Sequence, residues 1–242
     1  MTRSPGPHPL PIFLATLQAA CADDPARLAT ALAGLARYQQ APRPAPPPKR
    51  PEIARIGEVS LRGTPGPRPV VIVPSLINPA HVLDLPGRSL MAHLESAGLN
   101  PLIIDWGDSP EPLGLASLAN ERLAPLVEKL GQPVAMLGYC LGGTILAIAA
   151  ATMARDGDTR LASVTMFAAQ TDFSEPGELA FFINPSQLAM LEATMHKKGV
   201  LESKQMGGAF AMLRARDLLP QWRPRAVVVI VFLGNDFLDL DD

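Results

Sequence analysis

One cysteine has the sequence environment of an enzyme nucleophile. Cys140 is the third residue of the glycine-rich segment 138–144. A strand-like apolar run, 133–137, precedes this segment and a helix-like run, 144–151, follows it. A nucleophile on a tight strand-to-helix turn needs neighbours without side chains, because strand and helix crowd together there. Those neighbours are Gly138, Gly142 and Gly143. The pattern favours a cysteine that forms a covalent intermediate over the alternative, a small buried apolar residue.

Acyl chemistry at a thiol also requires donors for an oxyanion. The backbone N–H of Leu141, at the start of the expected helix, is suited to that role. A second donor is expected from the loop that follows the apolar strand 69–73. In that loop we expect the side chain of Asn78 to fix the backbone by hydrogen bonds.

The thiol also needs a base, and no histidine in the sequence suits that role well. The four histidines are His8, His81, His93 and His196. In folds with this type of turn the chain order is nucleophile, acid, histidine, and only His196 follows Cys140. His196 adjoins two lysines in a helical segment, which makes it a poor base.

Composition narrows the class of protein. The 242 residues are 48% hydrophobic with a formal net charge of −2, which indicates an ordinary globular protein without the basic excess of a nucleic-acid-binding protein. Cys21 and Cys140 are the only cysteines, so we expect no disulfide framework and a cytoplasmic location. No apolar run is long enough for a transmembrane segment. No cluster of side chains suggests a metal site.

The order of the expected elements predicts four parts. Residues 1–41 have helical spacing and form an N-terminal appendage, and the proline-rich stretch 42–51 is an extended linker. Strands alternate with helices over 52–170, which predicts a mostly parallel sheet whose ligands lie at the carboxyl ends of the strands. Residues 171–242 comprise a helical, cap-like segment and an incomplete end of the core.

These segments resemble the polyhydroxyalkanoate synthases, enzymes of the α/β-hydrolase superfamily in which a cysteine replaces the serine of the lipase box. The resemblance includes the box at 138–144, the loop 73–79 with the following Val82–Leu85, and the strand and turn 103–107. It extends into the cap-like segment, at 172–179, 205–206 and 213–218. It implies an α/β-hydrolase-like fold with a helical N-terminal appendage and a helical cap insertion.

The resemblance also implies a function. Enzymes of this family are acyltransferases that polymerise (R)-3-hydroxyacyl groups from coenzyme A thioesters into a polyester through a cysteine thioester. The expected partners are therefore the acyl-CoA and the growing polyester chain, with a homodimer or a partner subunit and association with a polyester granule as further expectations. No cofactor or metal is expected. By its place in the loop, Ile77 is the expected second oxyanion donor, through its backbone amide.

The acid has two interpretations. The run 226–233 reads as a buried strand, which would place Asp236 at its carboxyl end as the catalytic acid. By the resemblance the same run belongs to the cap, Asp236 is a loop residue, and the family's histidine and aspartate lie on later segments. On that interpretation the chain is C-terminally truncated and inactive alone.

Two other functions stay open from the sequence. One is a cysteine-dependent esterase or thioesterase, which transfers the acyl group to water. The other is a non-catalytic chain that associates with a granule or pairs with an active subunit.

Overall fold

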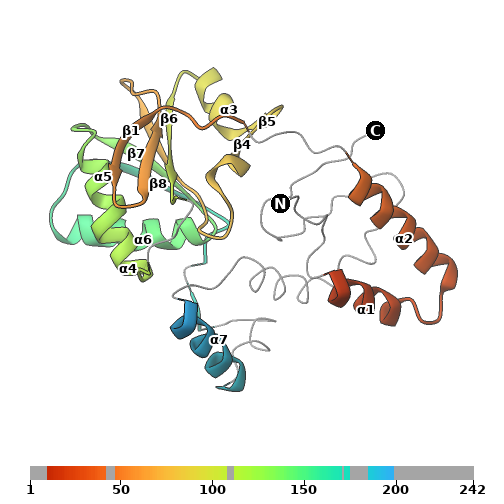
Figure 1. The fold of residues 1–242 in the computed structure, drawn as a ribbon. Helices are drawn as coiled ribbons and strands as arrows, with labels where there is room; N and C mark the ends of the chain where they lie inside the picture. The colour runs from red at the N-terminus through yellow and green to blue at the C-terminus, as the bar shows by residue number, and fades with distance from the viewer. Residues whose placement is uncertain (1–9, 42–46, 108–111, 171, 175–184, 199–242) are drawn as a thin grey trace. The chain divides into compact units, whose positions relative to one another are not determined.

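The computed structural model describes residues 10–41, 47–107, 112–170, 172–174 and 185–198 (Figure 1). The chain divides into two compact units. One extends from Pro46 to Glu175 and contains Cys140, and the other contains the remaining residues. We call the unit with Cys140 the core unit. The four-part division expected from the sequence stays a prediction.

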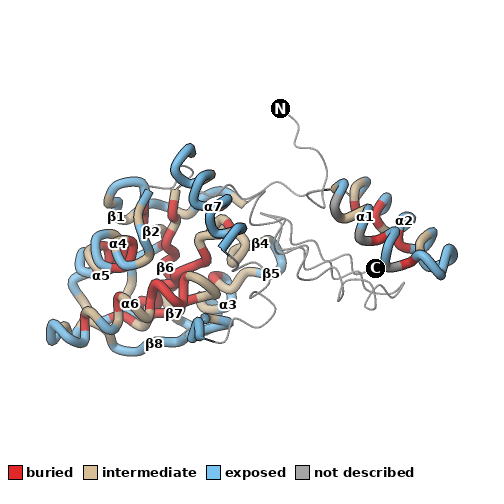
Figure 2. Tube along the Cα trace, turned by 90° about the horizontal axis from the view of Figure 1, so that it is seen from below, coloured by how far each residue is buried: buried red, intermediate tan, exposed pale blue. Residues whose placement is uncertain are grey.

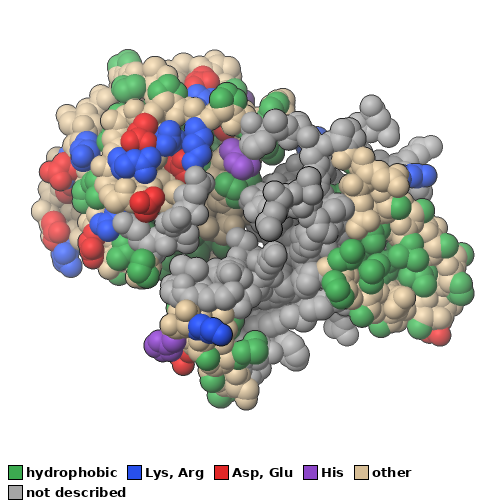
Figure 3. Space-filling view, in the orientation of Figure 1, with side chains coloured by type: hydrophobic (Ala, Val, Ile, Leu, Met, Phe, Trp, Pro, Cys, Tyr) green, Lys and Arg blue, Asp and Glu red, His purple; other side chains and the backbone are tan. Residues whose placement is uncertain are grey.

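Two helices form the described N-terminal part of the second unit. Helix α1 spans Leu10–Ala20 and helix α2 spans Pro25–Gln40, with Pro25 in the first turn. The carboxylate of Asp24 caps α2 by accepting a 2.9 Å hydrogen bond from the backbone N–H of Arg27. A small cluster of buried side chains joins the helices: Leu17, Cys21 and Ala31. Figure 3 shows further hydrophobic side chains over this helical pair.

A six-stranded sheet forms the centre of the core unit. Its strands are β1 (Glu52–Ile56), β2 (Val59–Gly63), β3 (Pro69–Val73), β6 (Asn100–Asp105), β7 (Val134–Tyr139) and β8 (Leu161–Phe167). They lie in the order β1-β2-β6-β3-β7-β8. Strands β6, β3, β7 and β8 are parallel to one another, and β1 and β2 extend the sheet antiparallel. This sheet confirms the expected α/β-hydrolase-like class.

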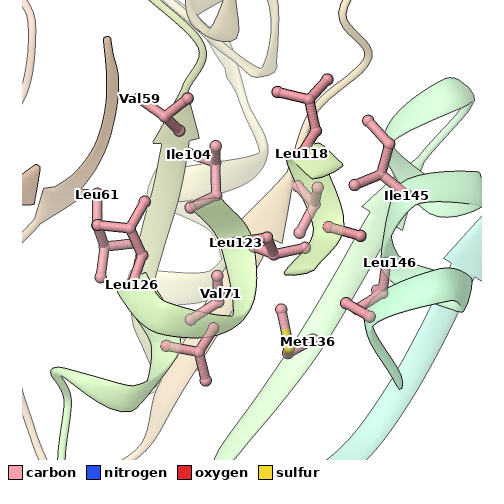
Figure 4. Close-up of a cluster of buried hydrophobic side chains, with 14 of the residues drawn as sticks. Val59, Leu61, Val71, Ile104, Leu118, Leu123, Leu126, Met136, Ile145 and Leu146 are labelled. Atoms are coloured by element: carbon pink, nitrogen blue, oxygen red, sulfur yellow. The ribbon is translucent and has the colours of Figure 1, made fainter. Parts of the chain in front are cut away.

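Helices cover both faces of the sheet, which explains why β3 is apolar and buried throughout. On one face lie α6 (Leu141–Arg155) and a continuous helical segment made of α4 (Leu115–Ser117), a π-helical turn η2 (Leu118–Leu123) and α5 (Ala124–Glu128). Figure 4 shows how their side chains meet those of the strands. Labelled members of this cluster include Val71, Ile104, Leu123, Leu126, Met136 and Ile145, all fully or almost fully buried.

The opposite face carries a smaller cluster beneath helix α3 (Leu90–Ser96). Met91 of α3 packs there with Val70, Ile72 and Ile103, which alternate in direction with the residues of the first cluster. The chain between β3 and α3 forms a 3₁₀ turn, η1 (Ala80–Leu83), and a short ladder of β4 (Asp84–Leu85) with β5 (Arg88–Ser89). This loop contains the segment that resembles the synthases.

The sequence analysis did not predict β1 or the short β4–β5 ladder. It did not predict the π-helical turn either, which ends at Leu123, two residues before Pro125. A π turn shifts the backbone bonding by one residue, so that the chain continues past a proline that donates no hydrogen bond.

Strand β8 is the outermost strand of the described sheet, and it is largely exposed (Figure 2). Val164, Met166 and Phe167 keep 37%, 45% and 62% of their surface accessible.

Later in the chain, helix α7 (Pro185–Lys198) is the described helix of the expected cap-like segment. The run 226–233 and Asp236 lie outside the described residues, so both interpretations of the acid stay predictions.

The described residues contain neither a membrane-spanning helix nor a group of side chains that could bind a metal ion. No helix in the described ranges combines the length and the apolarity that crossing a membrane requires. Likewise, histidine, cysteine and acidic side chains nowhere gather in a group of three that could hold a metal ion, as far as the structure describes the chain.

Candidate active site

Cys140 adopts the strained backbone of a nucleophile turn. It lies between the end of β7 and the first residue of α6, with φ 53° and ψ −127°. A residue with a side chain rarely adopts positive φ, and such strain persists only where the surrounding structure imposes it. The side chain is a free thiol and is partly accessible, whereas the other cysteine, Cys21, is buried. The turn that the sequence predicted is therefore present around Cys140.

The three glycines of the turn are each required by close contacts. A Cβ on Gly142 would overlap the carbonyl oxygens of Val73 and Pro74 at the end of β3. A Cβ on Gly143 would overlap the side chain of Ala169. A Cβ on Gly138 would lie 2.5 Å from the Cα of Gly143, across the turn. Strand and helix therefore approach at a distance that excludes any side chain at these positions.

The turn is held from the side of β8. The N–H of Cys140 donates a 2.9 Å hydrogen bond to the carbonyl of Phe167, and the hydroxyl of Thr144 donates one of 2.7 Å to the carbonyl of Gln170. The rings of Tyr139 and Phe167 stack with their centroids 5.7 Å apart. Burial, together with the neighbouring Cys140, raises the pKa of Tyr139.

The two expected oxyanion donors, the backbone N–H groups of Leu141 and Ile77, differ in whether they already donate a hydrogen bond. Leu141 is the first residue of α6, where a backbone N–H has no acceptor within the helix. The carbonyl of Cys140 accepts from the next amides along, those of Gly143 and Thr144. The N–H of Ile77, by contrast, donates a 3.3 Å hydrogen bond to the hydroxyl of Ser75. The Leu141 amide is thus available for an oxyanion, and the Ile77 amide would have to leave Ser75.

The expectation for Asn78 was wrong. Its side chain is only 5% exposed, but its amide nitrogen makes no hydrogen bond to the described structure. The side chain therefore does not fix the loop by donating to the backbone. Burial of an unpaired amide donor is unfavourable, which makes this group a natural partner for an acceptor brought to the loop.

A contact that the sequence analysis missed fixes the start of the same loop. The indole N–H of Trp106, just after β6, donates a buried 2.9 Å hydrogen bond to the carbonyl of Pro74, just after β3. The residues share no sequence pattern, because the bond joins positions 32 residues apart.

Two ion-pair groups surround this edge of the sheet. Arg50 pairs with Asp84 at 2.6 Å and with Glu95 at 2.5 Å. Asp105 pairs with Lys49 at 3.1 Å and with Arg62 at 3.0 Å. Figure 3 shows basic and acidic side chains interspersed on one face of the core unit. Lys49 and Arg50, near the end of the proline-rich stretch, therefore attach it to the strand end at Asp105 and to the loop at Asp84.

Both aspartates ionise more readily than usual. Burial opposes ionisation of Asp84, but hydrogen bonds from Arg50 and Ser89 and the charge of Arg50 outweigh it and lower its pKa. Burial likewise opposes ionisation of Asp105, where Lys49, the N–H of Gly107 and the charge of Arg62 lower the pKa. These acids are structural partners of cations and are poorly suited to accept a proton.

The histidines do not complete the site within the described residues. His81, in η1, has a pKa lowered by burial, an effect that Asp105 opposes and Lys49 adds to. His93 and His196 are exposed, on α3 and α7 respectively. No hydrogen bond joins any of these three imidazoles to Cys140 in the described structure. His8, like Asp236, lies outside that part of the chain.

Several curated proteins that are similar in sequence to this chain are named poly(3-hydroxyalkanoate) polymerase. The chain is 35% identical over 161 residues to a poly(3-hydroxyalkanoate) polymerase of Methylorubrum extorquens, which covers 63% of this chain and 27% of that protein. It is 36% identical over 161 residues to the poly(3-hydroxyalkanoate) polymerase subunit PhaC of Rhizobium meliloti, and 30% identical over 171 residues to that of Cupriavidus necator. These matches cover 63% of this chain and 26% and 28% of the two relatives.

The matched region thus spans about a quarter of the length of these relatives. No protein-family model matches the chain. The resemblance to polyhydroxyalkanoate synthases that the motifs indicated is confirmed by these relatives.

Two solved structures of enzymes are similar to this chain. One is a monoacylglycerol lipase of Paleococcus ferrophilus, with 20% identity, a TM-score of 0.41, and coverage of 57% of this chain and 49% of that one. The other is Est816, an N-acyl homoserine lactone degrading enzyme, with 14% identity, a TM-score of 0.43, and coverage of 70% and 62%. The fold class rests on the sheet order and the turn at Cys140 described above.

Proposed function

We propose that this chain carries the nucleophile of an acyltransferase that polymerises (R)-3-hydroxyacyl groups from coenzyme A thioesters into polyhydroxyalkanoate. The observation that carries the proposal is the strained, partly accessible Cys140 at the start of α6. The relatives named poly(3-hydroxyalkanoate) polymerase support the choice of reaction.

The chemistry follows from the position of the thiol. The Cys140 thiolate attacks the carbonyl carbon of the acyl-CoA, and the Leu141 N–H stabilises the oxyanion of the tetrahedral intermediate. Collapse of that intermediate breaks the carbon–sulfur bond to coenzyme A, which leaves as its thiol after taking up a proton. A hydroxyl of another acyl unit then attacks the enzyme thioester, and an ester forms as the Cys140 thiol is released. A thioester suits this step because it keeps a high acyl-transfer potential.

Two steps of this scheme require a proton acceptor. By the resemblance, a histidine deprotonates the thiol and an aspartate assists the hydroxyl. Asp236 is the candidate acid on the other interpretation, in which 226–233 is a buried strand. The reaction as written needs no metal or prosthetic group. A cytoplasmic location at a polyester granule, and pairing with a second copy or a partner subunit, belong to the same proposal.

The proposal is tested with (R)-3-hydroxybutyryl-CoA and residues 1–242 as a purified chain. We expect release of coenzyme A and incorporation of the acyl group into protein or polymer, both lost in Cys140→Ala. Cys21→Ala is the matched control, because it removes the buried cysteine and should leave both signals unchanged. A rate of coenzyme A release that Cys140→Ala does not change would overturn the proposal.

The same assay separates the alternative functions. Free 3-hydroxybutyrate without polymer, dependent on Cys140, would identify a thioesterase and contradict polymerisation. No Cys140-dependent acylation, even at alkaline pH, would leave the non-catalytic interpretation, in which the chain binds a granule or an active subunit.

A further inference from the structure

Trp106 connects the ends of two neighbouring parallel strands at the edge where Cys140 lies. Its indole N–H donates to the carbonyl of Pro74, and both groups are buried: Trp106 is 8% exposed. Strands β6 and β3 are adjacent in the sheet, so this bond joins the two segments that directly follow these strands. The carbonyl of Pro74 therefore has a fixed direction at the start of the loop that contains Ile77.

The same carbonyl lies against the first turn of α6. Its oxygen occupies the space where a side chain on Gly142 would lie. In that turn the amides of Gly143 and Thr144 donate to the carbonyl of Cys140. The amides of Leu141 and Gly142 are then those left without an acceptor, because the first N–H groups of a helix have none within it.

A backbone carbonyl beside two free helix N–H groups is a competitor for them. Val73, the other residue in contact with Gly142, already pairs with Gly138 in the ladder between β3 and β7. Without the indole N–H, the carbonyl of Pro74, which already lies beside the first turn of α6, would be free to accept a hydrogen bond from the amides there. That bond would occupy the N–H of Leu141, on which the oxyanion depends.

We propose that Trp106 is a positioning residue that keeps the oxyanion donor at Leu141 free by holding the carbonyl of Pro74 away from it. The inference rests on the proposed function, since it concerns the acyl-transfer step at Cys140. In this proposal Trp106 acts through the carbonyl of Pro74, to which its indole N–H donates.

The test compares two reactions of the same thiol. Acylation of Cys140 by p-nitrophenyl acetate or (R)-3-hydroxybutyryl-CoA passes through an oxyanion, whereas alkylation by iodoacetamide is a direct displacement at carbon and does not. Both rates are measured at pH 9. An ordinary cysteine thiol has a pKa of about 8.5, so at this pH it ionises without a catalytic base from the protein. We expect Trp106→Phe to slow acylation by at least about tenfold, because loss of an oxyanion donor typically costs 10²–10³ in rate. Alkylation should change by less than about twofold.

A second variant removes the indole N–H without changing its shape. Replacing Trp106 with benzothienylalanine in a Trp222→Phe background keeps the ring volume and loses only the donor, so it remains informative if Trp106→Phe folds poorly. Its acylation rate should fall as in Trp106→Phe, relative to the Trp222→Phe parent.

The outcomes separate the two proposals. Equal acylation of the parent and both Trp106 variants would overturn the role of Trp106 while the proposed function stands. Acylation and alkylation that fall together would also overturn it, since a general disturbance of the turn would act on both reactions. Failure of the unsubstituted chain to be acylated at Cys140 would instead count against the proposed function.

Discussion

The backbone N–H of Cys140 donates a 2.9 Å hydrogen bond to the carbonyl of Phe167, the last residue of β8. Cys140, which directly follows β7, is therefore also bonded to the neighbouring strand, and α6 begins directly after it. The ladder between β7 and β8 thus ends next to Cys140, the residue whose backbone is strained. Both the bond to β8 and the glycines of its own turn thus hold Cys140 in place.

Thr144 tests that dependence. Thr144→Val keeps the shape of the side chain but removes the donor to the carbonyl of Gln170. We expect a loss of about 0.5–1.5 kcal/mol in the free energy of unfolding, the usual net value of one hydrogen bond, measured by denaturant unfolding. Thr144→Ser keeps the hydroxyl, so it should unfold closer to the parent. Equal losses in the two variants would show that the methyl group matters and the hydrogen bond does not.

Gly142 is the most restricted glycine of the turn. Gly142→Ala places a methyl group on the carbonyls of Val73 and Pro74, so that the helix or the loop must move. We expect a destabilisation of about 1–3 kcal/mol, typical of overpacking, and acylation of Cys140 reduced more than tenfold. Gly114→Ala is the control, because no atom lies within 4 Å of its added Cβ and its φ is −71°. Comparable loss of acylation in both variants would contradict the steric account.

Asp84 predicts how stability depends on pH. Its pKa is lower in the folded chain, so its contribution is complete above the unfolded value of about 4 and is lost as the pH falls through the folded value. Asp84→Asn removes this contribution, and we expect the unfolding free energy to fall less between pH 6 and pH 3 than in the parent. The measurement is urea unfolding at a series of pH values.

Glu95 is the matched control for that comparison. It pairs with the same Arg50, but its side chain is 43% exposed, against 17% for Asp84. Exposed ion pairs contribute little, so Glu95→Gln should keep the pH dependence of the parent. The account would be wrong if Glu95→Gln flattened the profile as much as Asp84→Asn.

The core between the sheet and α5 supplies a prediction for stability alone. Leu126 is fully buried, and Leu126→Ala should cost about 2–5 kcal/mol through lost burial and the cavity that remains. Leu188 in α7 is 42% exposed, so Leu188→Ala should cost much less, about 0.5 kcal/mol. Denaturant unfolding of both variants gives the comparison, and a small effect at Leu126 would contradict the packing seen around it.

The turn and the sheet could be predicted from the sequence because local patterns determine them. The glycines around Cys140 and the continuous apolar run of β3 each require one backbone arrangement, and the structure has it. Gly98, a residue type that commonly ends helices, follows α3 with φ 75°. Strand β1 was missed because two of its five residues are exposed and the other three are only partly buried, so its apolar pattern is weak.

The contacts that complete the site were not predictable in the same way. The bond from Trp106 to Pro74 and the pairing of Arg50 with Asp84 join residues 32 and 34 positions apart. Their partners are fixed only when the strands have been ordered in the sheet. Asn78 shows that a local pattern can also mislead. Asparagine is typical of side-chain hydrogen bonds to the nearby backbone, yet the amide nitrogen of Asn78 is buried and makes no such bond.

The central claim is that Cys140 is an acyl-accepting nucleophile. The direct measurement is mass spectrometry of tryptic peptides after residues 1–242 react with (R)-3-hydroxybutyryl-CoA at pH 9 and are quenched in acid. We predict one 3-hydroxybutyryl adduct, on the peptide that contains Cys140, which disappears in Cys140→Ala and persists in Cys21→Ala. An unmodified Cys140 peptide, or an adduct on Cys21 alone, would contradict the claim.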